Sequence, residues 1–196
     1  MEFPVFPLNG AILFPGTNLP LNIFEERYIQ MVDYALSNNR IIGMIQKKEK
    51  KNFFKIGCFG KITNFVETED GRYQINLKGL KRFCYKKIIK NNYKFITVDA
   101  EILKNSKNIK LEENTKDELL SSFTKFLKIK KINFNISELK GLDASSLAKI
   151  ICVISPLDYL IKQMLLEFND DGELCKNLIS VLEIEMQNPE TKLKVN

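Results

Sequence analysis

Prolines interrupt the apolar segments at the start of this chain, and that pattern constrains the fold more than any other feature. The three segments are Phe3-Pro4-Val5-Phe6-Pro7-Leu8, Ile12-Leu13-Phe14-Pro15-Gly16 and Leu19-Pro20-Leu21-Asn22-Ile23-Phe24. Because proline lacks the N–H that a central strand must donate, we expect these short extended pieces at sheet edges or strand starts. Pro15-Gly16 predicts a turn, since proline presets φ and glycine accepts a positive φ.

The rest of the first half alternates apolar and polar residues with the period of a β-strand. From 72 to 78 the apolar side chains share one face, namely Tyr73, Ile75 and Leu77. Asp70-Gly71 predicts a hairpin turn that joins this strand to another at 62–68. We expect further strands at 41–46, 80–89 and 94–103. One helix is expected at 25–38, because an apolar stripe recurs there at helical spacing, at Tyr28, Met31, Val32 and Ala35.

In the second half of the chain, the apolar residues recur at the spacing of an α-helix. Residues 104–114 lack a hydrophobic pattern, so we place a linker there, between a β-rich domain at 1–103 and a helical bundle at 115–188. A tail is expected at 189–196. The predicted fold class is α+β, with a mostly-β N-terminal lobe of about six strands and one helix, followed by a C-terminal helical bundle.

Apolar stripes and capping residues locate the helices of the bundle. Two stripes are Leu119, Leu120, Phe123, Phe126 and Leu127, and then Leu147, Ile150, Ile151 and Ile154. Ser155, Pro156 and Asp158 predict a helix start, with serine as N-cap and proline at the first helical position. The side chains expected inward on that helix are Leu157, Leu160, Ile161, Met164 and Leu165. Asp170 with Glu173 can cap the last helix.

Four blocks of the chain, in order, resemble the Lon protease N-terminal domain in its free-standing form. The first and most specific runs from Phe6-Pro7-Leu8 through Leu13-Phe14-Pro15-Gly16 to Leu19-Pro20-Leu21-Asn22-Ile23-Phe24-Glu25-Glu26-Arg27-Tyr28. The others are Ile56-Gly57-Cys58-Phe59-Gly60-Lys61-Ile62, then Asp70-Gly71-Arg72 with Lys78-Gly79-Leu80-Lys81-Arg82-Phe83, and Ile161-Lys162-Gln163-Met164-Leu165-Leu166-Glu167. The resemblance implies the same two-lobe layout, with a β lobe similar in fold to PUA-type modules.

The resemblance also implies a function, which is recognition of unfolded or degron-bearing polypeptides without catalysis. Such a chain can serve as an adaptor that delivers clients to a separate ATP-dependent protease. Side chains that we nominate for a peptide-facing surface are Phe14, Leu19, Phe24, Phe53 and Phe54. Of these, Phe14 and Phe24 also suit core positions, whereas Phe53 and Phe54 adjoin a lysine-rich segment.

The residues needed for catalysis are not arranged in this sequence. There is no G-x-x-x-x-G-K-[ST] phosphate loop, and histidine is absent, which rules out a Ser-His-Asp triad. The four cysteines form no Cys-x-x-Cys pair, so we expect no metal and no cofactor. Two S-x-x-K spacings, Ser122 to Lys125 and Ser146 to Lys149, leave an unrecognised hydrolase as an alternative. We expect both to lie on the polar flanks of helices.

A net charge of +6 raises RNA binding as a second alternative. The two basic runs that contain aromatic residues are 47–55 and 81–87. However, the chain has 26 lysines and only four arginines, and arginine is the residue that nucleic-acid sites favour. We therefore prefer charged loops to a nucleic-acid site. No apolar run reaches the ~20 residues of a membrane span, so the expected location is the cytoplasm, with no membrane partner.

Overall fold

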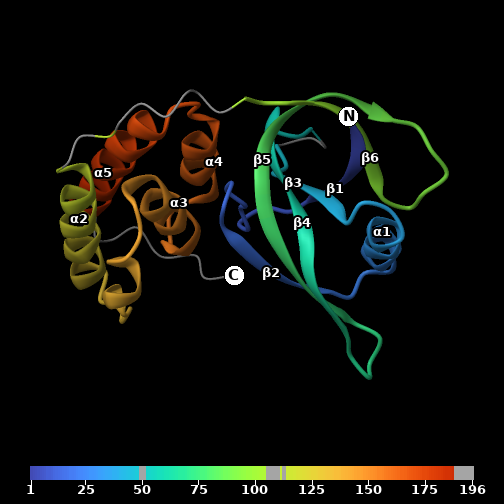
Figure 1. Ribbon diagram of the computed structural model, residues 1–196, viewed down its shortest axis with the longest axis horizontal. Coiled ribbons are helices and arrows are strands. Elements are labelled where there is room, and N and C mark those ends of the chain that lie inside the picture. Colours follow the sequence, from blue (N-terminus) through green and yellow to red (C-terminus); the bar gives the residue numbers. More distant parts are fainter. Residues whose placement is uncertain (49–51, 105–110, 112–113, 188–196) are drawn as a thin grey trace. The chain divides into compact units, whose positions relative to one another are not determined.

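The computed structural model describes residues 1–48, 52–104, 111 and 114–187. They belong to two compact units, Met1–Lys104 and Asn105–Asn196 (Figure 1). The first unit is mostly β and the second is helical, which confirms the predicted α+β class. The predicted linker at 104–114 lies largely outside the described residues, and the predicted tail at 189–196 lies wholly outside them.

Six strands form one mixed sheet in the first unit. They are β1 (Glu2–Pro7), β2 (Asn18–Ile23), β3 (Ile41–Ile45), β4 (Ile56–Glu67), β5 (Tyr73–Ile89) and β6 (Ile96–Ile102). The strand order is β2-β5-β4-β3-β1-β6, and β6 also pairs with β5. Because β5 pairs with β2 along its first half and with β6 along its second, five strands close into a ring and β2 adds to it. The sequence predicted two strands where β5 runs continuously through Gly79.

The inside of this ring is an aromatic and aliphatic core. Phe3 packs against Phe59 and Phe83, with ring centroids 5.7 and 5.0 Å apart. The other buried members of the cluster are Val5, Ile41, Ile45, Phe53, Val98 and Ala100. Such pairs of rings contribute both buried area and favourable edge-to-face geometry.

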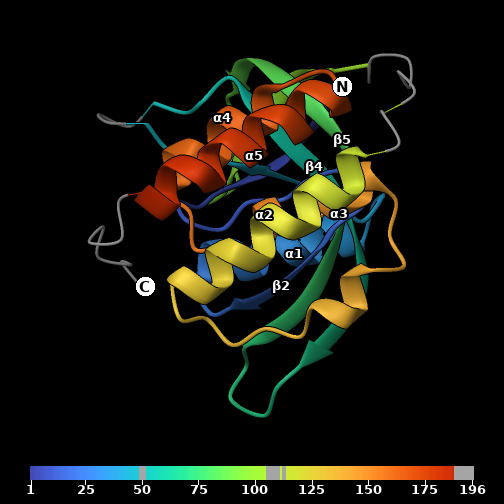
Figure 2. The same ribbon diagram turned by 90° about the vertical axis from the view of Figure 1, so that its left-hand side faces the viewer.

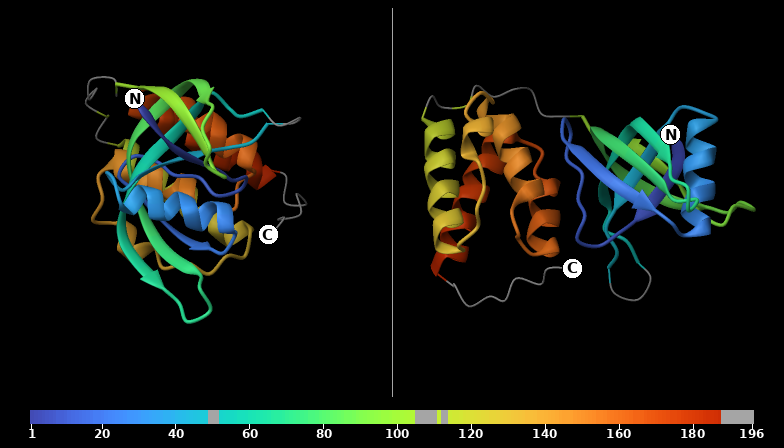
Figure 3. Two further views of the ribbon diagram at one scale, coloured as in Figure 1. Left: turned by 90° about the vertical axis from the view of Figure 1, so that its right-hand side faces the viewer. Right: turned by 90° about the horizontal axis from the view of Figure 1, so that it is seen from below.

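One helix, α1 (Glu26–Leu36), packs on the outer face of β1 and β3 (Figure 3). Side chains alternate along a strand, so Ile41 and Ile45 of β3 point into the ring while Ile42 and Met44 point outward, beneath α1. All five residues of β3 are therefore buried. The predicted stripe of Tyr28, Met31, Val32 and Ala35 is confirmed as the buried face of α1.

The prediction that the prolines lie at sheet edges is correct for β2 and wrong for β1. Pro20 is in β2, the terminal strand of the sheet. Pro4 and Pro7 are in β1, which lies between β3 and β6. In the register, Pro4 pairs with Thr97 of β6 before the pairing with β3 begins, and Pro7 pairs with Ile45 of β3 after the pairing with β6 has ended. An inner strand thus tolerates proline at a residue that pairs with only one of the two neighbouring strands.

The described residues of the second unit form five helical segments, and Figure 2 shows how the chain runs through them. They are α2 (Thr115–Ile129), the short 3-10 helix η2 (Ile136–Leu139), α3 (Ala144–Ile154), α4 (Tyr159–Glu167) and α5 (Asp171–Gln187). α5 packs against α2, α3 and α4. The N–H of Glu173 donates to Asp170 Oδ1 at 2.9 Å, which confirms the predicted cap of α5. None of the described helices is both long and apolar enough to cross a membrane.

The predicted start of α4 is wrong by three residues. Ser155 is extended (φ −68°, ψ 144°) and ends α3, because the following proline disfavours a helical conformation at this residue. Asp158 is the N-cap instead, and its Oδ1 accepts a hydrogen bond from the N–H of Leu160 at 2.8 Å.

The apolar stripe predicted for α4 is correct in part, because Leu157 and Leu165 are buried as expected. Leu160 and Met164 are exposed, whereas Lys162 and Gln163 are buried together with Leu165. The Lys162 ammonium donates to the carbonyl of Val153 at 2.9 Å, near the end of α3. Burial lowers the pKa of Lys162, and the nearby Cys152 acts in the opposite direction.

Candidate functional site

A cavity of about 450 Å³ opens on the β-rich unit. It lies where α1, the end of β1, the segment after β3 and the start of β6 come together. Pro7 and Ile96 contribute to its walls from β1 and β6. We call this cavity the aromatic pocket, because three buried rings line it.

The three rings are those of Tyr28, Phe53 and Phe95, which are 5%, 8% and 4% exposed. Each is supported from another side: Tyr28 packs 4.2 Å from Phe6, Phe53 lies edge-on to Tyr85, and Phe95 stacks in parallel on Tyr93. Burial raises the pKa of the Tyr28 hydroxyl, so this group stays a neutral hydrogen-bond donor at physiological pH. The floor of the pocket is therefore apolar and held in place before any ligand arrives.

Four cationic side chains also line the aromatic pocket, namely Arg27, Lys47, Lys48 and Lys94. The Arg27 guanidinium lies 4.5 Å from the centre of the Tyr28 ring and forms an ion pair with Glu25 at 2.6 Å. Lys94 forms an ion pair with Glu26. Both ion pairs are exposed to solvent, where such pairs contribute little to stability.

The other two cations differ in their surroundings. The Lys48 ammonium lies 4.8 Å from the centre of the Phe54 ring. Among the described residues, no carboxylate is within ion-pairing distance of Lys47 or Lys48. Within the described part of the chain, four cations at the pocket thus accompany two carboxylates, Glu25 and Glu26, and the sum of these charges is positive.

Ile88 brings an exposed apolar side chain to the pocket from β5. It is 52% exposed, and it pairs in register with Val98 of β6. Tyr93, 46% exposed, extends the apolar surface beyond the Phe95 ring. An apolar group that enters the pocket can thus contact both the buried rings and the exposed Ile88.

The five nominated residues are not gathered at one surface. Phe14, Leu19 and Phe53 are buried, at 2%, 9% and 8% exposure. Phe53 nevertheless lines the aromatic pocket, and Phe54 is half-buried beneath Lys48. Phe24 is 67% exposed, contrary to its suggested place in the core, and it does not line this pocket.

Sequence reasoning missed most of the pocket. Tyr28 was counted only as part of the core stripe of α1, and Ile88 only as a strand residue. The basic run at 47–55 was recognised, although residues 49–51 lie outside the described part of the chain. The pair Lys94-Phe95 could have indicated the site, because it places a basic residue next to an aromatic one, as the run at 47–55 does.

The hydrolase alternative rested on a serine and a lysine three residues apart. Ser146 is instead engaged with Asp143, to which its hydroxyl donates at 2.7 Å. Lys149 lies 2.8 Å from the hydroxyl of Ser145 and 3.0 Å from the carboxylate of Asp171 on α5. Ser145 also donates to the carboxylate of Asp171, so this cluster joins α3 to α5.

The serine of the second spacing and three of the four cysteines are shielded from solvent. Ser122 is buried at 7% exposure, so it is not on a polar flank of α2 as predicted. Burial raises the pKa of the Cys58 and Cys152 thiols far above the usual range and that of Cys175 to about 11. The described residues contain no cluster of three or more side chains suited to a metal ion.

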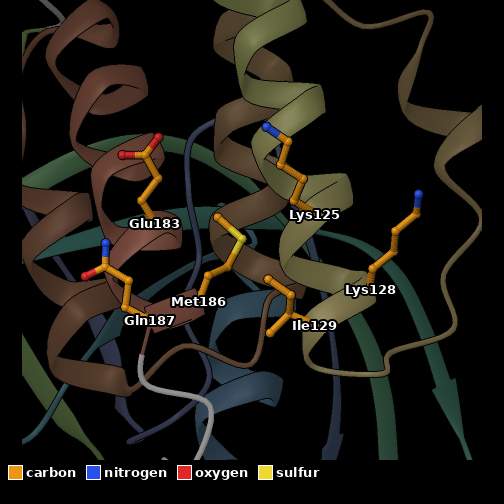
Figure 4. A pocket seen from close by; sticks show the side chains of 6 residues that line it. All are labelled: Lys125, Lys128, Ile129, Glu183, Met186 and Gln187. Atoms are coloured by element: carbon orange, nitrogen blue, oxygen red, sulfur yellow. The ribbon is translucent and has the colours of Figure 1, made fainter.

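A second cavity, of about 480 Å³, lies in the helical unit between α2 and α5 (Figure 4). Its lining consists of Lys125, Lys128, Ile129, Glu183, Met186 and Gln187. These side chains are long and carry no ring, and cationic and anionic groups are mixed among them. The aromatic pocket has the more rigid lining and the more uniform charge, so we take it as the candidate site.

Comparisons with known proteins identify the family. A family model described as the substrate-binding domain of the ATP-dependent protease La (LON) matches residues 2–183. The Lon proteases of Buchnera aphidicola subsp. Acyrthosiphon pisum and of Escherichia coli (strain K12) are each 26% identical to this chain. Each alignment covers 95% of this chain and 25% of the relative, so the chain spans about a quarter of the length of these proteins.

Solved structures show the same fold. A Lon N-terminal domain protein from Xanthomonas campestris covers 92% of this chain and 98% of its own, with a TM-score of 0.72 at 18% identity. The N-terminal domain of Mycobacterium avium complex Lon protease covers 93% and 98%, with a TM-score of 0.70 at 16% identity. The family model spans nearly the whole sequence, and this chain therefore belongs to the Lon substrate-binding domain family.

Proposed function

We propose that this chain binds segments of polypeptide without cleaving them, and that the aromatic pocket receives an apolar side chain of the client. The observation that carries the proposal is a concave site with three buried rings in a chain of a substrate-binding family. Concave sites lined by apolar rings and a few polar groups are the usual form of a binding site.

The expected affinity follows from the size of the site. One or two large client side chains that leave water contribute ~3–6 kcal/mol. Loss of the client's freedom on binding offsets much of this. The dissociation constant should therefore lie between micromolar and millimolar, which allows a binder to sample many unfolded chains.

Side-chain docking supports the proposal better than strand addition does. Strand addition needs a row of free N–H and C=O groups along a sheet edge. β2 is the terminal strand of the sheet, and Pro20 in its middle cannot donate such a hydrogen bond. We place the client in the aromatic pocket for this reason.

The clients that we propose are unfolded or degron-bearing polypeptides, and the partner is a separate ATP-dependent protease for which this chain acts as an adaptor. Three of the residues in the first block of the family resemblance, Pro7, Arg27 and Tyr28, line the aromatic pocket. Pull-down from extract with the intact chain tests the adaptor role, and recovery of clients without any protease would contradict it.

Substitution of Ile88 tests the site. Ile88→Asn should raise the dissociation constant for a labelled, aromatic-rich unfolded peptide about three- to tenfold, measured by fluorescence polarisation, because part of the apolar contact is lost. The side chain is 52% exposed, so the fold should tolerate the change.

Val66→Asn is the matched control. Val66 is β-branched, 47% exposed and in a strand, but it lines a different hollow with Asn22 and Asn76. The affinity of the Val66→Asn variant for the labelled peptide should equal that of the unchanged chain. If neither the unchanged chain nor the control binds any unfolded peptide, the proposed function is wrong; if Val66→Asn weakens binding and Ile88→Asn does not, the pocket is wrong.

A further inference from the structure

We infer that the aromatic pocket selects acidic–apolar segments, in which a large apolar side chain of the client is flanked by carboxylates. This inference rests on the proposed function and names the class of client. It follows from the charges that line the pocket rather than from its apolar floor. An apolar floor alone would accept any large hydrophobic residue.

Two lysines beside the floor provide the selectivity. Backbone hydrogen bonds fix their positions: the N–H of Lys47 donates to Asn9 Oδ1 at 2.8 Å, and the N–H of Lys48 donates to the carbonyl of Asn52 at 2.7 Å. Lys47 also pairs in an antiparallel bridge with Phe53, whose ring forms part of the floor. The backbone of both residues is thereby held beside the pocket that their side chains line.

These lysines can act on a client because neither forms an ion pair with a carboxylate among the described residues. Arg27 and Lys94 already have carboxylate partners, Glu25 and Glu26. A client carboxylate near Lys47 or Lys48 therefore meets uncompensated positive charge. A client lysine at the same place would be repelled, which makes the pocket discriminate by attraction and by repulsion.

The shape of the site favours a peptide over a nucleic acid. Bases bind single strands by stacking on free ring faces, and the three floor rings are each less than a tenth exposed. Tyr93 is more exposed, but one of its faces is already stacked on Phe95, with centroids 4.8 Å apart. A flexible side chain can reach such a recessed floor, whereas a base would need an open platform.

Three labelled peptides test the inference. They share one sequence around a central phenylalanine and differ only in the flanking residues, which are Asp and Glu, Asn and Gln, or Lys. With the intact chain at low salt, we expect the acidic peptide to bind about five- to tenfold more tightly than the amide peptide, and the lysine peptide to bind least. The preference should shrink as salt is added, because exposed charges are screened.

A double variant assigns the preference to the two lysines. In Lys47→Gln/Lys48→Gln the ratio of amide to acidic dissociation constants should fall close to one. Lys61→Gln/Lys78→Gln is the matched control, since these exposed lysines face each other across β4 and β5 and the loss of charge is the same. The control should keep the full ratio, which separates a local effect from one of net charge.

Each outcome decides between the claims. Equal affinity for the acidic and amide peptides, or a ratio that the control variant also abolishes, would overturn this inference and leave the proposed function intact. Binding of none of the peptides would remove both. A single-stranded RNA probe that binds more tightly than the acidic peptide, and that loses affinity in Lys47→Gln/Lys48→Gln, would overturn the inference in favour of nucleic acid.

Discussion

Gly79 shows how one residue can determine the packing of a whole turn. A Cβ at this position would lie 2.1 Å from the backbone oxygen of Phe14. The close approach is fixed by two hydrogen bonds of 2.9 Å, from the N–H of Gly16 to the Gly79 carbonyl and from the N–H of Gly79 to the Thr17 carbonyl. The turn that contains Pro15 and Gly16 is thus held directly on β5.

We therefore expect Gly79→Ala to lower the free energy of unfolding by about 3 kcal/mol, since the added methyl group meets backbone rather than a flexible side chain. Urea unfolding followed by circular dichroism measures the change. Gly141→Ala is the control, because nothing lies within 4 Å of a Cβ there, and it should be neutral or slightly stabilising. Equal stability of Gly79→Ala and the unchanged chain would contradict this account.

The residues of the aromatic pocket show the limit of sequence reasoning at this scale. The turn at Pro15-Gly16 could be predicted because its signal is local, and Gly16 indeed has a φ of 85°. The pocket combines Arg27, Lys48 and Lys94, which come from three separate segments. Only the pairing of β1 with both β3 and β6 brings those segments together, and no local pattern specifies that pairing.

Among the helices, α3 offers a test of N-capping. The Oδ1 of Asp143 accepts a hydrogen bond from the N–H of Ser146 at 3.0 Å, and its Oδ2 accepts one from the Ser146 hydroxyl at 2.7 Å. These hydrogen bonds lower the pKa of Asp143. Because the folded-state pKa is the lower one, the stabilisation is complete above the ordinary aspartate pKa of ~4 and is lost as pH falls towards the folded-state value.

Asp143→Ala should therefore lower the free energy of unfolding by about 1 kcal/mol at neutral pH, and the difference from the unchanged chain should shrink below about pH 4. Urea unfolding at a series of pH values measures both effects. Asp143→Asn keeps a capping group that cannot ionise, so it should stay near the unchanged chain at neutral pH. A loss of stability for Asp143→Ala that is the same at every pH would argue against the ionised cap.

A comparison of α2 with α4 shows why some helices were predicted well and others were not. The hydrophobic period was strong in α2, where Leu119, Phe123 and Phe126 are buried as expected. In α4 the serine and proline that looked like a start belong to the end of α3, since the same residue types occur at both kinds of boundary. Of the side chains expected inward, Leu165 is buried but Leu160 is exposed, and Lys162 is buried instead.

For the whole molecule, we propose that the two compact units are separate folding domains. All residues that line the aromatic pocket lie within Met1–Lys104, and so do all six strands and α1. A fragment of residues 1–104 should therefore fold and bind the acidic peptide with the affinity of the intact chain, within about twofold. Circular dichroism and fluorescence polarisation measure the two properties.

A fragment of residues 105–196 is the natural control, and it should not bind that peptide. If the 1–104 fragment folds but binds at least tenfold more weakly, the helical unit contributes to the site. If it does not fold, the β-rich unit is not an independent domain. The α+β class could be foreseen from the change of hydrophobic period after residue 103, but closure of the ring could not, because β6 pairs with both β1 and β5.

The inner position of β1 has a consequence for how this chain is made. Its residues 2–7 are synthesised before β6, with which they pair and which ends at residue 102. During synthesis, roughly a hundred further residues must be added before β6, the second strand that pairs with β1, is complete. Such late pairing slows folding and prolongs the exposure of an aggregation-prone apolar segment. Until β6 has been synthesised, β1 is therefore an exposed apolar segment of the kind that chaperones bind.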